Sequence, residues 1–195
     1  MKTKSVQNEG LLFSNLIYAL PRKSELGIFL QKNDTNAKKG MVINMDYIGR
    51  WVFHSMGVLG DNGMVYLSAE EFINSPMPYV DETDTEAVEQ ELRDRRGITK
   101  AELRICDDGN LYVLLPVPEE ILAEAVDEAV AAGELMMIDG MITQKPMHWE
   151  LRDGEVWYDT QLIGEICGEV TDPWVRALDE DGFFNIADTR YIKAE

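Results

Sequence analysis

The sequence predicts an α+β fold in which an antiparallel β-meander has two or three helices packed on one face. Asp-Gly dipeptides at 108–109, 139–140 and 153–154 each lie between strand-like runs. Asp-Gly favours two-residue hairpins, because both turn positions need positive φ. Between the first two dipeptides lies "PVPEEILAEAVDEAVAAG", with a proline near its start and a glycine where a helix C-terminus belongs. The second half therefore predicts strands with a helix inserted, and the spacing of the last two dipeptides predicts a meander over 134–166.

The first half predicts shorter elements. Two strands are expected at 11–20 and 26–31, and periodicity assigns the apolar stretch 41–60 to neither helix nor strand. "DNG" at 61–63 predicts a hairpin turn into the strand-like "MVYL". Ser68 and Glu71 have the spacing of a capping box that opens a short helix. The prolines of "SPMPYV" then break regular structure, so we expect one α+β domain over 1–195, with a candidate subdomain boundary near 75–82.

Length and composition predict a globular protein of the reducing cytoplasm. The chain has 195 residues, of which 45% are hydrophobic and 28% charged, enough to form a sizeable core. No apolar run approaches the roughly 20 residues that a membrane-spanning helix needs. The two cysteines, Cys106 and Cys167, permit one disulfide but form no framework. The start of the chain is a poor match to a secretion signal, because polar and acidic residues precede its apolar stretch.

The net charge of −18 is unevenly distributed along the chain. Residues 1–50 carry eight Lys or Arg against four Asp or Glu, a net of +4, and residues 51–195 carry ten against thirty-two, a net of −22. Residues 107–172 hold sixteen acids against two bases, a net of −14. This charge disfavours binding to nucleic acid or anionic membranes and favours encounter with basic partners.

The most acidic short stretch, "DETDTEAVEQELRDRR" at 81–96, is predicted to compensate its own charge. Its acids concentrate at the expected start of a helix and its arginines at the end, an order that complements the helix dipole. Glu89 with Arg93, and Glu91 with Arg95, also have the favourable i,i+4 orientation. We therefore interpret this acidity as the solvated side of a helix.

The helix expected at 119–132 differs, because no basic residue lies within reach along it. Its apolar residues occupy one face, and the opposite face carries a row of acids, Glu120, Glu124, Asp127 and Glu128. Successive acids in such a row are about 5 to 6 Å apart, comparable with the spacing of phosphates along a nucleic-acid strand. The row is either a recognition surface or the ordinary polar face of a helix in an acidic protein.

The stretch "HWELRDGEVWYD" at 148–159 predicts a second candidate surface. A two-residue turn at Asp153-Gly154 would pair Arg152 with Glu155 and place Trp149, Leu151, Val156 and Tyr158 on the core face. The other face then carries His148, Glu150, Arg152, Glu155, Trp157 and Asp159. Trp157 among carboxylates is either an interface anchor or a side chain covered by a neighbouring segment.

Signatures of catalysis are mostly missing from the sequence. Only two histidines occur, His54 and His148, and neither lies in a metal-binding or nucleophile motif. "DEDG" at 179–182 has part of the pattern of a calcium loop, but its twelfth position is Arg190 rather than glutamate, so a turn is expected. No cofactor, metal site or catalytic residue is predicted.

These observations predict a non-enzymatic, cytoplasmic binding protein that inhibits a basic, nucleic-acid-handling partner by occupying its nucleic-acid site. Anti-defence proteins that imitate DNA, such as anti-CRISPR or antirestriction proteins, form such a functional class. The partner is expected to be a basic protein, with no direct contact to nucleic acid or membrane, and homo-oligomerisation stays open. The residues assigned to partner binding are Glu120, Glu124, Asp127, Glu128, Glu150, Glu155, Trp157 and Asp159.

Three alternatives stay open at the level of sequence. An immunity protein that neutralises a cationic toxin would use the same charge, with Trp157 as its anchor. A small enzyme would use scattered carboxylates, or a metal held by His54, His148 and acids. A structural component would associate through its basic first third and acidic remainder.

Overall fold

The computed structural model describes residues 47–61, 63–161, 165–166, 169–170 and 172–195. Residues 48–195 form one compact unit, and every described helix and strand belongs to it. The strands expected at 11–20 and 26–31 lie outside the described residues, as does Cys167.

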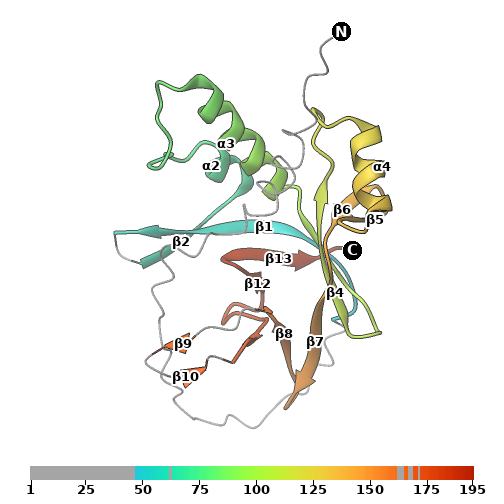
Figure 1. Ribbon diagram of the computed structural model, residues 1–195. Helices are drawn as coiled ribbons and strands as arrows, with labels where there is room; N and C mark the ends of the chain where they lie inside the picture. The colour runs from blue at the N-terminus through green and yellow to red at the C-terminus, as the bar shows by residue number, and fades with distance from the viewer. Residues whose placement is uncertain (1–46, 62, 162–164, 167–168, 171) are drawn as a thin grey trace. The chain divides into compact units, whose positions relative to one another are not determined.

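The unit is built on an antiparallel sheet that curls into half of a barrel (Figure 1). Its strands run in the order β11-β8-β7-β4-β3-β1-β13-β12, β2 pairs with β1, and the β5–β6 hairpin joins β4 through β6. The strands of this sheet are β1 (Gly49–Gly60), β2 (Gly63–Leu67), β3 (Glu102–Ile105), β4 (Asn110–Pro116), β5 (Met136–Ile138), β6 (Met141–Thr143), β7 (Met147–Arg152), β8 (Glu155–Asp159), β11 (Trp174–Arg176), β12 (Phe184–Ile186) and β13 (Thr189–Lys193). A separate pair consists of β9 (Glu165–Ile166) and β10 (Glu169–Val170). With three helices beside it, this sheet gives the unit the α+β class that the sequence predicts.

The core is centred on Phe184, which is fully buried. Its ring centroid lies 5.4 Å from that of Trp51 on β1 and 6.3 Å from that of Tyr158 on β8. Since β12 and β8 lie toward opposite ends of the strand order, Phe184 joins the two ends of the curled sheet. Burying a side chain of this size stabilises the folded state by about 1.5 to 3 kcal/mol.

Two of the three Asp-Gly turns are confirmed as two-residue hairpins. The β5–β6 turn has φ of 51° at Asp139 and 79° at Gly140, and the β7–β8 turn has 53° at Asp153 and 84° at Gly154. In all four residues φ is positive, as this turn type requires.

The prediction of a two-residue turn at 108–109 is wrong by one residue. The Cys106 amide donates to the Asn110 carbonyl at 2.9 Å, so residues 107–109 form a three-residue loop between β3 and β4. The Asp108 carboxylate accepts from the Asn110 amide at 3.0 Å and from its side-chain amide at 2.8 Å. Only Gly109 of the three has positive φ, 82°, which is the arrangement of a three-residue hairpin loop.

The strands over 134–166 differ from the predicted simple meander. β6 pairs with β4 at Leu115 and Pro116, whereas β7 pairs with β4 at Asn110 and Leu111. The seven residues of β4 are enough for β6 to pair near its end and β7 near its start, so β6 and β7 do not follow one another as neighbours in a simple meander. The stretch 41–60, which periodicity left open, forms β1 from Gly49 onward.

Three helices, α2 (Ala69–Ile73), α3 (Thr85–Ile98) and α4 (Ala123–Ala131), belong to the unit. The predicted capping box is confirmed at α2, where the Ser68 hydroxyl accepts from the Glu71 amide and the Glu71 carboxylate accepts from the Ser68 amide. α2 lies against β1 and β2, and α3 lies against α2 and β4. Packing of all helices on one face of the sheet stays a prediction. The segment 75–82 connects α2 to α3 inside the unit.

The helix expected from residue 119 begins four residues later, at Ala123. The Ile121 amide donates to the Pro118 carbonyl at 3.1 Å, which closes a separate turn before the helix. The N-cap of α4 is Leu122, which has no side-chain acceptor for the helix amides. At the other end Gly133 has φ of 75°, as a glycine after a helix commonly does.

The turn expected at "DEDG" is present. The Asp179 carboxylate accepts from the Asp181 and Phe183 amides, and Gly182 has φ of 85°. Arg190 on β13 donates to the carboxylates of Asp179 at 2.5 Å and Asp181 at 2.6 Å. Arg190 thus pairs with both acids and offsets one of their two negative charges. Within the described residues, none of the helices has the length and apolarity needed to cross a membrane.

Candidate protein-interaction surfaces

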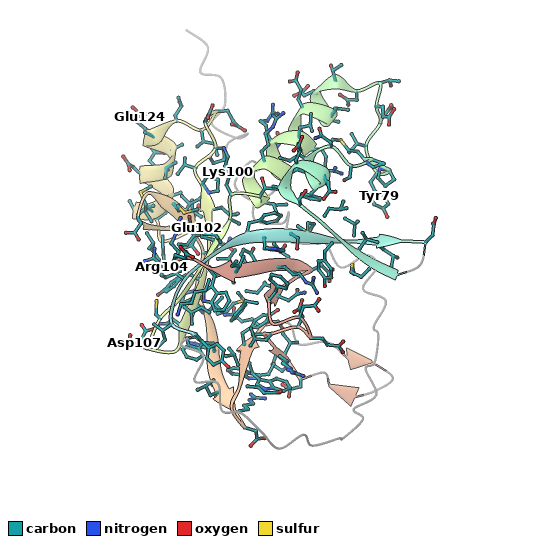
Figure 2. The ribbon with its side chains drawn as sticks, turned by 180° about the vertical axis from the view of Figure 1, so that it is seen from behind. Tyr79, Lys100, Glu102, Arg104, Asp107 and Glu124 are labelled. Carbon is teal, nitrogen blue, oxygen red and sulfur yellow. The ribbon has the colours of Figure 1, made fainter. Side chains whose placement is uncertain are left out.

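The residues predicted to bind a partner fall on two separate surfaces. One group belongs to α4 and the turn before it, and the other to the β7–β8 hairpin. α4 lies above β1 in Figure 1, whereas the β7–β8 turn lies far below it. Figure 2, the view from behind, keeps Glu124 of α4 at the top. The two groups therefore cannot act as one continuous patch.

The first surface is the exposed side of α4. Val126 and Ala129 are buried and fix the orientation of the helix. Glu124, Asp127 and Glu128, here called the acidic row, are exposed on the remaining side, and Glu124 projects away from the ribbon (Figure 2). Among the described residues, no Lys, Arg or His forms an ion pair with any of the three. The acidic row is thus an uncompensated group of three carboxylates spaced three and one residues apart along the helix.

Glu120 does not belong with the acidic row. It precedes α4, and its Oε1 lies 3.4 Å from Nε of Arg93 on α3. The prediction that no basic residue compensates Glu120 considered only neighbours along the expected helix, so the contact between this turn and α3 was missed. Burial raises the pKa of the neighbouring Asp94 carboxyl, and the charges of Glu91 and Glu120 raise it further. Glu120 is therefore paired with a base of α3, unlike the three acids of the acidic row.

Exposed apolar side chains lie on both sides of the acidic row in the sequence. Leu122 at the N-cap is 64% exposed, and Met136 and Met137 on β5 are 41% and 46% exposed. Flexible methionines and an exposed leucine are side chains that adapt to a partner surface. Charge and apolar contact are therefore both available at this end of the unit.

The β7–β8 hairpin has the register that the sequence predicts. Trp149 pairs with Tyr158, Glu150 with Trp157 and Arg152 with Glu155. Val156 and Tyr158 are buried, as expected of the core face. Leu151 was predicted to be buried and is 56% exposed, and it lies toward the end of β7 that does not pair with β4.

The polar face of the hairpin is largely compensated. Glu150 pairs with Arg152 at 2.5 Å, and Glu155 pairs with Arg176 on β11 at 3.0 Å. Asp159 accepts a hydrogen bond from the Gln161 amide at 2.7 Å. The carboxylates of this face are therefore weaker candidates for recognition of a basic partner than the acidic row.

Trp157 is half-buried and belongs to an aromatic cluster that the sequence did not predict. The Arg152 guanidinium lies 5.3 Å from the Trp157 ring and 4.5 Å from the ring of Trp174 on β11. β11 pairs with β8 so that Arg176 lies opposite Trp157. β11 thus lies beside Trp157 and contributes to its partial burial, and the role of Trp157 as an interface anchor stays a prediction. Trp174 and Arg176 were missed because no local turn signal connects β8 to β11.

The two histidines lie on different strands with different neighbours. The ring of His54 on β1 is 4.3 Å from that of Phe183, and His148 on β7 pairs with Asn110 on β4. In the part of the chain that the structure describes, no three or more His, Cys, Asp or Glu side chains are grouped so as to hold a metal ion. Burial raises the pKa of the Cys106 thiol, and the charge of Asp108 adds to the effect, which favours the unreactive thiol form.

Comparison of the chain with protein-family models, with curated proteins and with solved structures found no match.

Proposed function

We propose that this protein is a non-enzymatic, cytoplasmic inhibitor that binds a basic, nucleic-acid-handling protein and occupies its nucleic-acid site, as an anti-CRISPR or antirestriction protein of the DNA-mimic type would. The observation that supports the proposal most is the acidic row Glu124, Asp127 and Glu128, exposed and without ion-pair partners among the described residues. It lies within the segment 107–172, whose net charge is −14. A row of fixed carboxylates presents negative charge to a basic groove in the way that phosphates do.

The physical basis is competition for the same cationic side chains. Lys and Arg in a nucleic-acid groove are attracted to any closely spaced anions. On α4 the helix backbone holds the carboxylates at a fixed spacing, so less ordering free energy is needed on binding than for a flexible acidic tail. The exposed Leu122 and the two methionines of β5 add apolar contact beside the charge.

The proposal is tested by capture of partners from nuclease-treated bacterial lysate, at about physiological and at high salt. The bait proteins are the wild type, the triple reversal E124K/D127K/E128K, and the control reversal E82K/E86K/E180K. The control changes net charge equally, at exposed acids on α3, just before it, and in the "DEDG" turn. We expect the wild type and the control to capture the same basic nucleic-acid-binding protein at low salt, and the triple reversal to lose it.

Two results would contradict the proposal. Equal capture by the triple reversal and the wild type would exclude the acidic row from the contact. Equal loss by both reversals would mean that overall charge alone determines binding, with no specific surface.

An immunity protein directed at a cationic toxin is a second candidate, and the aromatic cluster of Arg152, Trp157 and Trp174 favours it. A partly exposed tryptophan beside an arginine is typical of an interface anchor. This candidate predicts that W157A weakens partner binding more than the triple reversal of α4 does. Our first proposal predicts the opposite order.

A further inference from the structure

The longest stretch of the described unit that is almost without charge is the β1–β2 arm, residues 56–60 of β1 and 63–67 of β2. In a chain that is 28% charged, residues 51–69 contain a single Asp, Glu, Lys or Arg, which is Asp61 at the turn. The arm nevertheless exposes apolar side chains. Leu59 is 82% exposed, Met64 46% and Val65 48%.

β2 is also an edge strand. It pairs with β1 from Gly63 to Leu67, and no described strand pairs with its other side (Figure 1). The hydrogen-bonding groups of alternate residues in an antiparallel strand point to opposite sides, so part of the β2 backbone faces outward unpaired. Proteins usually protect such an edge with charged residues, proline or a bulge.

The strand β11, at one end of the strand order, shows this protection. β11 carries Arg176, which pairs with Glu155, and Asp172 lies two residues before the strand. Gly63–Leu67 has neither charge nor proline. The two edges therefore differ in the feature that normally prevents strand pairing between molecules.

We propose that the edge of β2 pairs antiparallel with β2 of a second copy of this chain, which joins two sheets across a two-fold axis. If all five residues of β2 pair with the same five residues of the other copy, the two-fold axis passes through the central residue, Val65. Val65 then lies opposite Val65 of the other copy, and Met64 lies opposite Tyr66. Such a self-complementary contact is the usual geometry of a symmetric dimer.

Charge selects a second copy over the basic partner of the proposed function. Two chains of net charge −18 repel wherever their acidic surfaces approach, and the arm lets them meet with no carboxylate inside the paired strands. A basic partner gains no electrostatic attraction from an uncharged arm, whereas α4 offers it three carboxylates. The dimer contact and the acidic row thus lie on different elements, and either proposal can fail without the other.

The test is sedimentation velocity of the full-length protein across a wide range of concentration, at low and high salt. We expect a dimer that persists in high salt, because apolar and backbone contacts are not screened. V65K should raise the dimer dissociation constant about tenfold or more, since it buries two like charges opposite each other. V175K makes the same substitution on the edge strand β11, where Val175 is 36% exposed, and should leave the dimer unchanged.

A cysteine variant tests the register without weakening the strand. Residues directly opposite in an antiparallel pair have Cα atoms about 4.5 or 5.5 Å apart, which is within the range of a disulfide. V65C should therefore form a covalent dimer on mild oxidation, whereas wild type and V175C should not. The proposal is overturned by a monomer at all concentrations, by a V65K dimer as stable as wild type, or by a dimer that dissociates in high salt. The last result would point instead to contact between the basic first third and the acidic remainder.

Discussion

Arg95 makes one contact that the helix sequence predicts and several that it does not. Its predicted i,i+4 ion pair with Glu91 is confirmed at 2.7 Å. Arg95 is also buried, and its guanidinium donates to the carbonyls of Phe72, Ser75 and Pro76. These acceptors lie 19 to 23 residues earlier in the chain, so the periodicity of α3 alone does not predict them. Arg95 therefore joins α3 to the segment that follows α2.

Replacing Arg95 by lysine should destabilise the fold. An ammonium group cannot reproduce the planar fork that reaches several carbonyls, and a buried acceptor left without a donor costs about 1 to 3 kcal/mol. We expect R95K to lower the free energy of unfolding in urea by that amount. R96K changes the neighbouring exposed arginine and should have an effect within about 0.5 kcal/mol. Equal effects of the two substitutions would exclude the structural role of Arg95.

Glu102 should make the stability of the unit depend on pH. The Arg50 side chain donates to the Glu102 carboxylate at 2.6 Å, and this hydrogen bond, with the Arg50 charge, holds the carboxyl pKa below its usual value of 4.5. The stabilisation is present above that usual value and is lost as pH falls through the lowered folded-state pKa.

We therefore expect the difference in free energy of unfolding between wild type and E102Q to shrink as pH is lowered from about 5 toward 2. The measurement is urea denaturation at a series of pH values. In an R50Q background, the change in free energy of unfolding caused by E102Q should no longer shrink in this way as pH is lowered. A difference that stays constant with pH in the wild-type background would argue against the ion pair.

At the scale of elements, hairpins were predictable where glycine marked the turn. The register of the β7–β8 hairpin followed from Asp153-Gly154 alone, because a two-residue turn fixes every pair beyond it. The β12–β13 hairpin was missed, because its turn residues, Ala187 and Asp188, have φ of 49° and 65° without any glycine. The Gly57 amide on β1 donates to the Asp188 carbonyl at 2.8 Å. A long-range contact thus supports a turn that local preference disfavours.

Relief of this backbone strain should stabilise the unit. A left-handed conformation costs an alanine roughly 1 to 2 kcal/mol, and glycine avoids that cost but loses more entropy on folding. We expect A187G to raise the free energy of unfolding by about 0.5 to 1 kcal/mol. G154A, at φ of 84° in the β7–β8 turn, should lower it by about 1 kcal/mol. A loss of stability in A187G would show that the β12–β13 turn is not strained.

The residues of the candidate surfaces were predictable from the sequence, but their neighbours in the folded structure were not. The sequence identified the acids of α4 and the alternation of the β7–β8 hairpin, since both follow from local periodicity. It could not show that Arg93 reaches Glu120, or that β11 brings Trp174 beside Arg152, since these contacts join segments distant in the chain. The contact with Arg93 thus separates Glu120 from the uncompensated acids of α4.

At the scale of the whole molecule, the net charge of −18 should oppose folding. Like charges repel more in the compact state than in the unfolded chain, and salt screens this repulsion. We expect the free energy of unfolding to rise when sodium chloride is increased from low to about physiological ionic strength. Neutralising the acidic row with E124Q/D127N/E128Q should raise the low-salt stability and reduce the salt effect. A fall in stability with added salt would mean that favourable ion pairs dominate over repulsion.

The most direct test of inhibition by occupancy is a competition measurement with the captured basic partner and fluorescently labelled duplex DNA. Fluorescence anisotropy follows release of the DNA as this protein is added. We expect full release by the wild type and by the E82K/E86K/E180K control, and weak release by E124K/D127K/E128K. A ternary complex, in which the partner binds this protein and keeps its DNA, would exclude inhibition by occupancy, because the two ligands would then occupy different sites.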